Sequence, residues 1–252
     1  MAFKLGKLAP RKLLSTPAFG DYLDKATAWP VVKPRGWEYA VPADKLGMLG
    51  NDEIGNCVIC AMMHYAQAET ANTSNPLTPT TGQTIETYSA ITGYDPKNPH
   101  TDKGTYWTDA LTYWKQHGIP LLNAKGQEVI HKILGWASLD LSSIAQQRYA
   151  CDLFGGTLMG VQLPASAEVD MTNWRYVPGS RCVGGHGVNR EGQGGAGWHV
   201  GSWGKWIPGT WEFSLKFADE DYIVTTPAWV DVQGKSPSGL DLNGLLAKMK
   251  SL

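Results

Sequence analysis

Apolar residues recur at helical spacing through the first half of the chain. The segment that begins at Cys57 is rich in Ala, Met and Ile, and residues 81–92 carry apolar side chains at spacings of three. Residues 109–117 also read as a helix, and Gly118 supplies its stop. Polar, turn-rich stretches separate these segments, so the pattern predicts successive helices.

The second half of the chain favours strands. Residues 129–137 alternate between apolar and polar side chains well enough for a strand. Residues 157–163 form an apolar run typical of a buried strand. Glycines separate further short β segments, predicted at residues 185–189, 198–203, 211–216 and 222–225. A helix capped by residues 140–143 ends at residues 155–156, and a last helix covers residues 240–250. Because helices dominate the first half of the chain and strands the second, the pattern indicates an α+β fold rather than a parallel sheet in which strands and helices alternate.

The pattern also predicts a domain organisation. Residues 1–49 contain several prolines and little periodicity, which indicates an extended arm. Residues 50–230 form the main domain, helical over about 50–125 and β over about 126–230, and residues 231–252 are a tail with a short helix. We expect the apolar side chains of the arm and the tail to dock on the protein's own body or on partners in an assembly.

Composition excludes several classes of protein. A chain of 252 residues with 42% hydrophobic residues can bury a sizeable core. A formal charge of −1 predicts no nucleic-acid partner, and the absence of an 18-residue apolar run predicts no membrane span. The basic N-terminus lacks the apolar core of a signal peptide, so we expect a cytoplasmic location, or a virion if the chain is phage-encoded.

The cysteines are few for a protein of this size. The four at positions 57, 60, 151 and 182 do not form a dense disulfide framework. We expect reduced thiols, although a bridge between Cys151 and Cys182 stays open.

Cys57 is a candidate nucleophile. A turn-forming run, residues 51–56, leads directly into it, so the thiol lies in the first turn of a predicted helix. Unpaired N–H groups and the positive end of the helix dipole favour the thiolate there. Free cysteine is also among the most buried residue types, so a purely structural role stays open.

His64 and Cys60 suggest two other kinds of site. Both share roughly one helix face with Cys57, which could indicate a metal site or a thioredoxin-type redox pair. Structural zinc sites require four ligands, and no second cysteine pair is visible. The redox motif lacks its usual βαβ surroundings. We therefore predict no metal and no cofactor.

His186 is the strongest partner for a nucleophilic cysteine. Cysteine hydrolases need an imidazole that takes the thiol proton and later protonates the leaving group. His186 begins a predicted strand and is flanked by Gly185 and Gly187, which allow another chain to approach closely.

Four blocks of sequence resemble those of papain-like cysteine peptidases, in the same order. They are Asn51, Gly55 and Cys57 around the nucleophile; residues 103–111; residues 185–188; and residues 202–204. The resemblance spans about residues 50–226, and His186 and the Ser202 region lie at the expected distance after the cysteine. The run from Tyr88 to Pro96 also looks like a divergent branch of bacterial and phage proteins in that superfamily.

The resemblance implies a fold and a catalytic site. The fold would have a helical first lobe and an antiparallel β second lobe, with the active site in a cleft between them. Cys57 would attack a carbonyl, with His186 as general base and acid. Asn51 would hold the oxyanion together with the Cys57 backbone N–H.

The resemblance also implies a substrate site. Gly104 would offer backbone hydrogen bonds to an extended peptide, and Gly55 and Gly185 would line the same groove. Trp203 would shield the imidazole from water.

The chain departs from the family pattern at several positions. Gly201 stands where the family has the asparagine that orients the histidine, which leaves Ser202 and Asn189 as candidates for that role. Asn189 is three residues from His186 and should face the other side of a strand. Only 56 residues precede Cys57 in this sequence, fewer than the family's usual inhibitory prosegment.

These observations predict a cysteine-dependent hydrolase, a peptidase that cleaves an amide bond in a peptide or other amide substrate. The alternative is a papain-like domain with weak or no activity that serves as a structural or binding component, for example of a phage particle.

Overall fold

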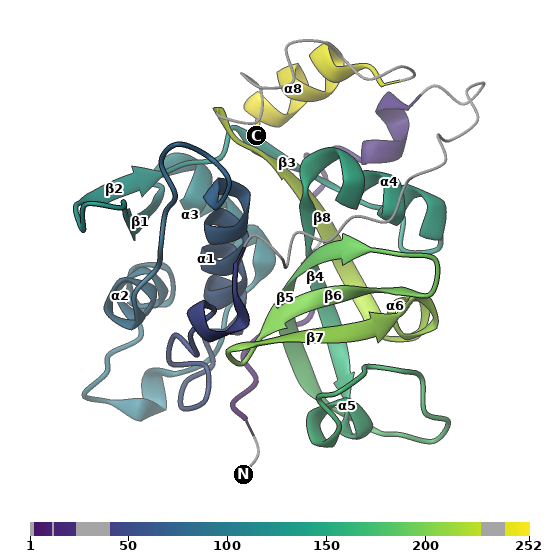
Figure 1. Ribbon diagram of the computed structural model, residues 1–252, viewed down its shortest axis with the longest axis horizontal. Coiled ribbons are helices and arrows are strands. Elements are labelled where there is room, and N and C mark those ends of the chain that lie inside the picture. Colours follow the sequence, from purple (N-terminus) through teal and green to yellow (C-terminus); the bar gives the residue numbers. More distant parts are fainter. Residues whose placement is uncertain (1–2, 12, 24–40, 228–239) are drawn as a thin grey trace.

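A computed structural model of the chain describes residues 3–11, 13–23, 41–227 and 240–252. Three helices and a short hairpin lie on one side of the molecule, and a large antiparallel sheet with further helices around it forms the other, with the long central helix α1 (Cys57–Thr70) facing the sheet (Figure 1). This arrangement confirms the predicted α+β fold.

The helical side is built around α1, in which every residue except Glu69 is buried. Such a helix packs on all faces, which explains its weak amphipathic pattern. A capping box formed by Thr80 and Gln83 begins the next helix. The other elements on this side are α2 (Thr81–Thr92), η3 (Pro99–Thr101), α3 (Trp107–Gln116) and a hairpin of β1 (Ile119–Leu122) with β2 (Glu128–His131).

The β side is a six-stranded antiparallel sheet in the order β3-β8-β4-β5-β6-β7. Its strands are β3 (Gly135–Ser138), β4 (Gly156–Pro164), β5 (Cys182–Gln193), β6 (Gly197–Ser202), β7 (Lys205–Thr210) and β8 (Ala218–Thr225). The helices that accompany it are α4 (Ile144–Phe154), α5 (Ala165–Val169) and α6 (Trp211–Phe217). The N-terminal end of α1 lies against β5, which brings two of the predicted site blocks together.

Two strand predictions were wrong. Residues 129–137 divide between β2 and β3, which belong to different sheets, because the alternation continues through the chain segment that joins them. Residues 211–216 are helical, in α6. The Thr210 hydroxyl accepts a hydrogen bond from the Phe213 amide at 3.2 Å, and this cap selects the helix.

The described parts of the arm and tail pack on the protein itself. Phe19, in η1 (Phe19–Tyr22), is fully buried against Tyr149 and Phe154. The last helix, α8 (Leu242–Lys250), joins the same cluster. Much of the arm and tail, residues 24–40 and 228–239, lies outside the described residues, so docking on other chains stays a prediction.

None of the helices in the described ranges has both the length and the hydropathy of a bilayer-spanning segment.

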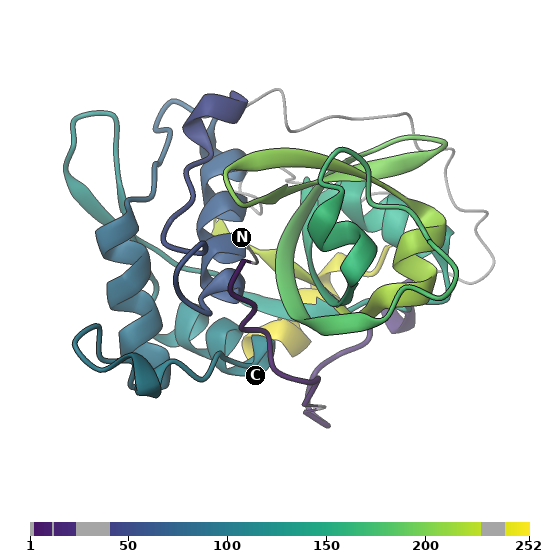
Figure 2. The same cartoon turned by 90° about the horizontal axis from the view of Figure 1, so that it is seen from below.

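The first described residues take a path that the sequence did not predict. Residues 3–8, called the N-terminal segment below, pass between α1 and the sheet before the chain turns away (Figure 2). Contacts with both sides of the molecule hold the segment there.

Candidate active site

Cys57 is the first residue of α1 and is 1% exposed. Its sulfur accepts a hydrogen bond from the backbone N–H of Gly187 at 3.4 Å. Burial raises the pKa of the thiol, and the backbone amides of Gly187 and Gly6 oppose that rise. The sulfur is therefore a neutral thiol in this arrangement.

His186 lies on β5, immediately before Gly187, and is fully buried. Its Nε2 lies 2.7 Å from the hydroxyl oxygen of Ser202. Its ring stacks on Trp203 with centroids 4.3 Å apart and planes inclined by 14°. Within the described part of the chain, Nδ1 has no hydrogen-bond partner. This nitrogen is the one left to exchange a proton with a thiol.

The charge state of His186 follows from what surrounds it. Burial, and then the positive charge of Lys7, lower the pKa of the imidazole to about 3. The imidazole is therefore neutral in this arrangement, as is the Cys57 thiol.

Of the two candidates for orienting His186, Ser202 contacts its ring, whereas the Asn189 amide has another partner. The Asn189 amide donates instead to Glu191 at 2.6 Å. A Cβ on Gly201 would lie 2.7 Å from the Asn189 Oδ1 atom, so the Asn189 side chain fills the space that a larger residue at 201 would need. The missing family asparagine is thus explained by packing.

The Asn51 side chain points at the N-terminal segment. Its Nδ2 lies 3.4 Å from the carbonyl oxygen of Lys4 and 3.3 Å from that of Ile54. The amide expected to hold an oxyanion therefore donates to a peptide carbonyl of the chain itself.

The N-terminal segment fills the groove beside Cys57 and is bonded to both walls. The Lys7 amide donates to the Gly185 carbonyl at 3.1 Å, on the sheet side. On the helical side, the Leu8 amide donates to the Thr105 carbonyl at 3.0 Å, and the Thr105 amide donates to the Gly6 carbonyl at 2.9 Å. The segment therefore lies between the helical side and the sheet side, at Cys57 and beside the strand that carries His186.

Close backbone contacts explain two of the glycines. A Cβ on Gly6 would lie 1.8 Å from the Gly55 carbonyl oxygen, and one on Gly104 would lie 2.0 Å from the Gly6 carbonyl oxygen. Gly104 does line the groove, yet its amide donates to the Tyr88 hydroxyl at 2.9 Å. The hydrogen bonds to the segment come from Thr105 instead.

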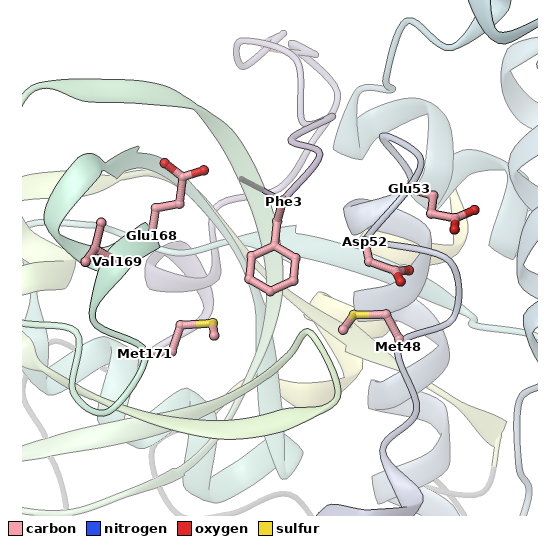
Figure 3. Close-up of a pocket in the computed structure, with 7 residues that line it drawn as sticks. All are labelled: Phe3, Met48, Asp52, Glu53, Glu168, Val169 and Met171. Atoms are coloured by element: carbon pink, nitrogen blue, oxygen red, sulfur yellow. The ribbon is translucent and has the colours of Figure 1, made fainter. Parts of the chain in front are cut away.

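Phe3 forms one end of the segment. Its ring stacks on Trp203 at 4.6 Å between centroids, with planes inclined by 15°. Figure 3 shows Phe3 between Met171 on the sheet side and Met48 on the helical side, in a pocket of about 910 Å³. Trp203 therefore contacts both His186 and Phe3 of the segment.

Charged contacts hold the rest of the segment. The Lys4 ammonium lies 3.2 Å from Asp102, whose carboxylate also accepts hydrogen bonds from Tyr88 and Gly55. The Lys7 ammonium is buried between Asp219 and Glu220.

These segment contacts were missed by the sequence analysis. The arm was predicted to dock, but its position depends on backbone hydrogen bonds to Thr105 and Gly185, which lie almost 100 and 180 positions away in the sequence. No local motif in a single sequence signals such a pairing.

The other candidate thiol and imidazole have local partners. His64 Nε2 lies 2.7 Å from the Leu46 carbonyl, and burial lowers the pKa of this imidazole to about 4. The Cys60 sulfur contacts the Leu49 carbonyl and the Asn56 side chain. Within the described residues, no group of three or more His, Cys, Asp or Glu side chains is placed to hold a metal ion.

All four cysteines are free thiols. Cys151 is buried and Cys182 is exposed, and no bridge joins them.

Comparisons with known proteins give a fold. No protein-family model matches the chain, and no curated protein matches its sequence. Xylellain, a cysteine protease from Xylella fastidiosa, matches with a TM-score of 0.67 and 14% identity over 89% of this chain and 97% of its own. Procathepsin B from Trypanosoma congolense matches with a TM-score of 0.58 and 12% identity, over 88% of this chain and 86% of its own. A cysteine protease from Carica candamarcensis matches with a TM-score of 0.55 and 13% identity, over 78% of this chain and 99% of its own. At these identities the likeness shows the fold, and this chain has the papain-like fold of those cysteine proteases.

Proposed function

We propose that this chain is a latent cysteine hydrolase, a peptidase that cleaves amide bonds with Cys57 as nucleophile and His186 as general base and acid. The observation that carries the proposal is the hydrogen bond from Gly187 to the Cys57 sulfur. It holds the thiol at the head of α1 against the strand residue next to His186. Nucleophile and base must lie within reach of each other in any such enzyme.

The proposed reaction begins when the N-terminal segment leaves the groove. His186 Nδ1 takes the thiol proton of Cys57, and the thiolate attacks the carbonyl carbon of the substrate. The Asn51 amide and the Cys57 backbone N–H donate to the oxyanion of the tetrahedral intermediate. The C–N bond then breaks as His186 returns the proton to the departing amine, which leaves a thioester on Cys57.

Hydrolysis of the thioester completes the cycle. His186 takes a proton from water, and the resulting hydroxide adds to the thioester carbonyl. The C–S bond breaks, the acid product leaves, and the thiolate of Cys57 is restored.

Ser202 is the positioning residue in this mechanism. If Nε2 carries the ring proton and donates to the Ser202 hydroxyl oxygen, Nδ1 is left with the lone pair that accepts the thiol proton. Trp203 stacks on the same ring and limits its rotation. Ser202 and Trp203 together would orient the His186 ring, as the asparagine at this position does in papain-like peptidases.

Latency follows from what the segment presents to the sulfur. The backbone amide of Gly6 lies near the Cys57 sulfur, and the Gly6 carbonyl is bonded to Thr105. An N–H group is not an electrophile, so the segment occupies the site without being a substrate in this arrangement. It must move before any substrate carbonyl can reach Cys57.

The alternative function is a papain-like domain that binds or supports other proteins without catalysis. The complete burial of His186 and Cys57 favours it, because a permanently covered pair has no access to substrate.

One experiment separates these functions. A Lys7→Ala chain, in which the segment is weakened, is treated with a peptide epoxide and assayed for hydrolysis of a denatured protein. We expect the label on Cys57 and measurable hydrolysis, and we expect both to be lost when Cys57→Ser or His186→Ala is added. Absence of hydrolysis, with the four cysteines labelled only as their exposure dictates, would establish the non-catalytic alternative.

A further inference from the structure

We propose that the pocket now filled by the Lys7 side chain selects a lysine or arginine side chain of the substrate, at a residue beside the bond that is cut. This inference rests on the proposed hydrolase function and names its substrate class. The pocket is formed by Gly160 on β4 and by Asp219 and Glu220 on β8.

The pocket holds two carboxylates that need a cation. The Lys7 ammonium lies 3.0 Å from Asp219 Oδ1 and 3.0 Å from Glu220 Oε1, and its side chain has no exposed surface. Within the described residues, those two carboxylate oxygens have no hydrogen-bond partner apart from this ion pair. Loss of the ammonium would leave the buried Glu220 carboxylate and the partly buried Asp219 carboxylate without an opposite charge, which is costly.

Neighbouring side chains fix the carboxylates in place. Gln162 donates to the second oxygen of Asp219, and the Tyr222 hydroxyl donates to the second oxygen of Glu220 at 2.9 Å. Burial raises the pKa of Glu220, and the Lys7 charge opposes that rise. The Asp219 oxygen that Gln162 holds also accepts a hydrogen bond from the Lys7 ammonium at 3.0 Å, whereas Glu220 turns its other oxygen toward the cation.

The shape of the pocket suits a long, unbranched side chain. A Cβ on Gly160 would lie 2.3 Å from Lys7 Cε and 2.9 Å from Cδ, so the lysine stem occupies the space that this glycine leaves open. An arginine would serve as well, because its planar guanidinium can donate to two carboxylates at once. A leucine or a glutamate would leave the acidic pair unneutralised.

The position of the pocket relates this selectivity to the cut bond. The Lys7 amide is held by Gly185, next to His186, and the preceding residue, Gly6, lies at the Cys57 sulfur. A substrate that replaces the segment in this groove must either fill the acidic pocket with a cation or leave it unpaired. Sites that require a charged or hydrogen-bonding group discriminate strongly against analogues that lack it.

A first test measures the pocket's preference without catalysis. The rate of Cys57 alkylation by iodoacetamide reports release of the segment in full chains that carry Lys7→Arg, Lys7→Met or Lys7→Glu. We expect Lys7→Arg to behave as the unmodified chain, Lys7→Met to react about tenfold faster or more, and Lys7→Glu to react faster still. The control is Lys4→Met, which removes the segment's other, half-exposed lysine and should have a much smaller effect.

A second variant ties the effect to the acidic pair. In a Glu220→Gln chain, the added effect of Lys7→Met should shrink severalfold, because the two residues act as a pair. Equal alkylation rates for the unmodified chain and the Lys7→Met chain, or a Lys7→Met effect that Glu220→Gln leaves unchanged, would overturn the inference.

The substrate itself is tested with peptides. The Lys7→Met chain is given a peptide mixture that presents Lys, Arg, Leu or Glu at each position, and the cut bonds are identified by mass spectrometry. We expect cuts beside Lys or Arg to be favoured about tenfold or more, and Glu220→Gln to reduce that preference. Equal cutting beside Leu would overturn the inference and leave the hydrolase intact. No cutting of any peptide would overturn the proposed function, while the alkylation series still decides separately whether the pocket prefers a cation.

Discussion

The two ends of the N-terminal segment are held in different ways. At one end, the ring of Phe3 stacks on Trp203 and remains partly exposed beside an open pocket. At the other end, Lys7 is enclosed and its ammonium pairs with Asp219 and Glu220. The contact at Phe3 is apolar and partly exposed to solvent, whereas the contact at Lys7 is ionic and the lysine side chain is buried.

This difference indicates how the groove opens. An aromatic stack at a partly exposed site contributes modestly and can separate with small fluctuations. A buried ion pair resists separation, because the partner left behind keeps an uncompensated charge. We therefore expect the Phe3 end to loosen first and the Lys7 end to control whether Cys57 is reached.

The largest effect is expected at Gly6, between the two ends. A Cβ there would lie 1.8 Å from the Gly55 carbonyl oxygen, a backbone atom that cannot turn aside. Gly6→Ala should raise the fraction of released segment by up to about 100-fold, because such overpacking costs up to about 3 kcal/mol. The measurement is the rate of trypsin cleavage after Lys7, which is buried in the covered form.

Gly195→Ala is the matched control for this substitution, since a Cβ at Gly195 meets nothing within 4 Å. If trypsin cuts the Gly6→Ala and Gly195→Ala chains at the same rate, the close contact at Gly6 does not hold the segment in place.

Acid should loosen the segment by a smaller factor. The pKa of His186 is lowered to about 3 by burial and by Lys7, and we expect release of the segment to remove the charge of Lys7 and to weaken the effect of burial. The released form therefore binds more protons between about pH 3 and 6.5, so the covered form loses stability as pH falls through that window. From pH 7 to 5 we expect protection of the Lys7 and Leu8 amides against hydrogen exchange to fall about tenfold, after correction for intrinsic rates.

His186→Gln should weaken this dependence while it leaves His64, the other imidazole of lowered pKa, and the raised pKa of Glu220 in place. Protection that stays constant or rises on acidification of the unmodified chain would contradict the assigned coupling between His186 and the segment.

Phe3→Ala tests the aromatic end. Loss of the stack on Trp203 should speed trypsin cleavage after Lys7 about fivefold, because aromatic pairs contribute about 0.5–1.5 kcal/mol beyond their buried area. Leu14→Ala, at a side chain that is 97% exposed, should leave the rate unchanged. An effect of Phe3→Ala as large as that of Gly6→Ala would show that the aromatic end, rather than the ionic end, controls release.

The smallest effect is expected from Lys4→Ala. The Lys4 side chain is 48% exposed, and solvent screens its pairing with Asp102. Asp102 keeps hydrogen bonds from Tyr88 and Gly55 without it. Cleavage after Lys7 should change by no more than about twofold. A larger change would mean that exposed charge contributes as much as the buried pair.

The sequence contained enough to predict the main elements and to single out Cys57 and His186 as candidates. Turn residues before Cys57 and the stop at Gly155 are local signals, and the helices that they bound were correctly placed. The motif around His186 is also local, and the structure brings it to Cys57 through the contact of α1 with β5. The strand predicted at residues 211–216 failed because a short alternating run also fits a helix when Thr210 caps it.

The position of the N-terminal segment could not be predicted from such local signals. Residues 3–8 gain their position from Thr105, Gly185 and Glu220, which are distant in sequence and carry no pattern that pairs them with Lys7. The choice between Ser202 and Asn189 beside His186 is similar, since only the fold shows that Asn189 fills the space beside Gly201.

The most direct test of the account is the rate of Cys57 alkylation by iodoacetamide near neutral pH in the Gly6→Ala chain, with and without His186→Ala. The account predicts that Cys57 reacts well ahead of the buried thiols of Cys60 and Cys151, and that His186→Ala slows it to their level. Equal, slow alkylation of all three thiols in both chains would contradict an activated thiol beneath the segment.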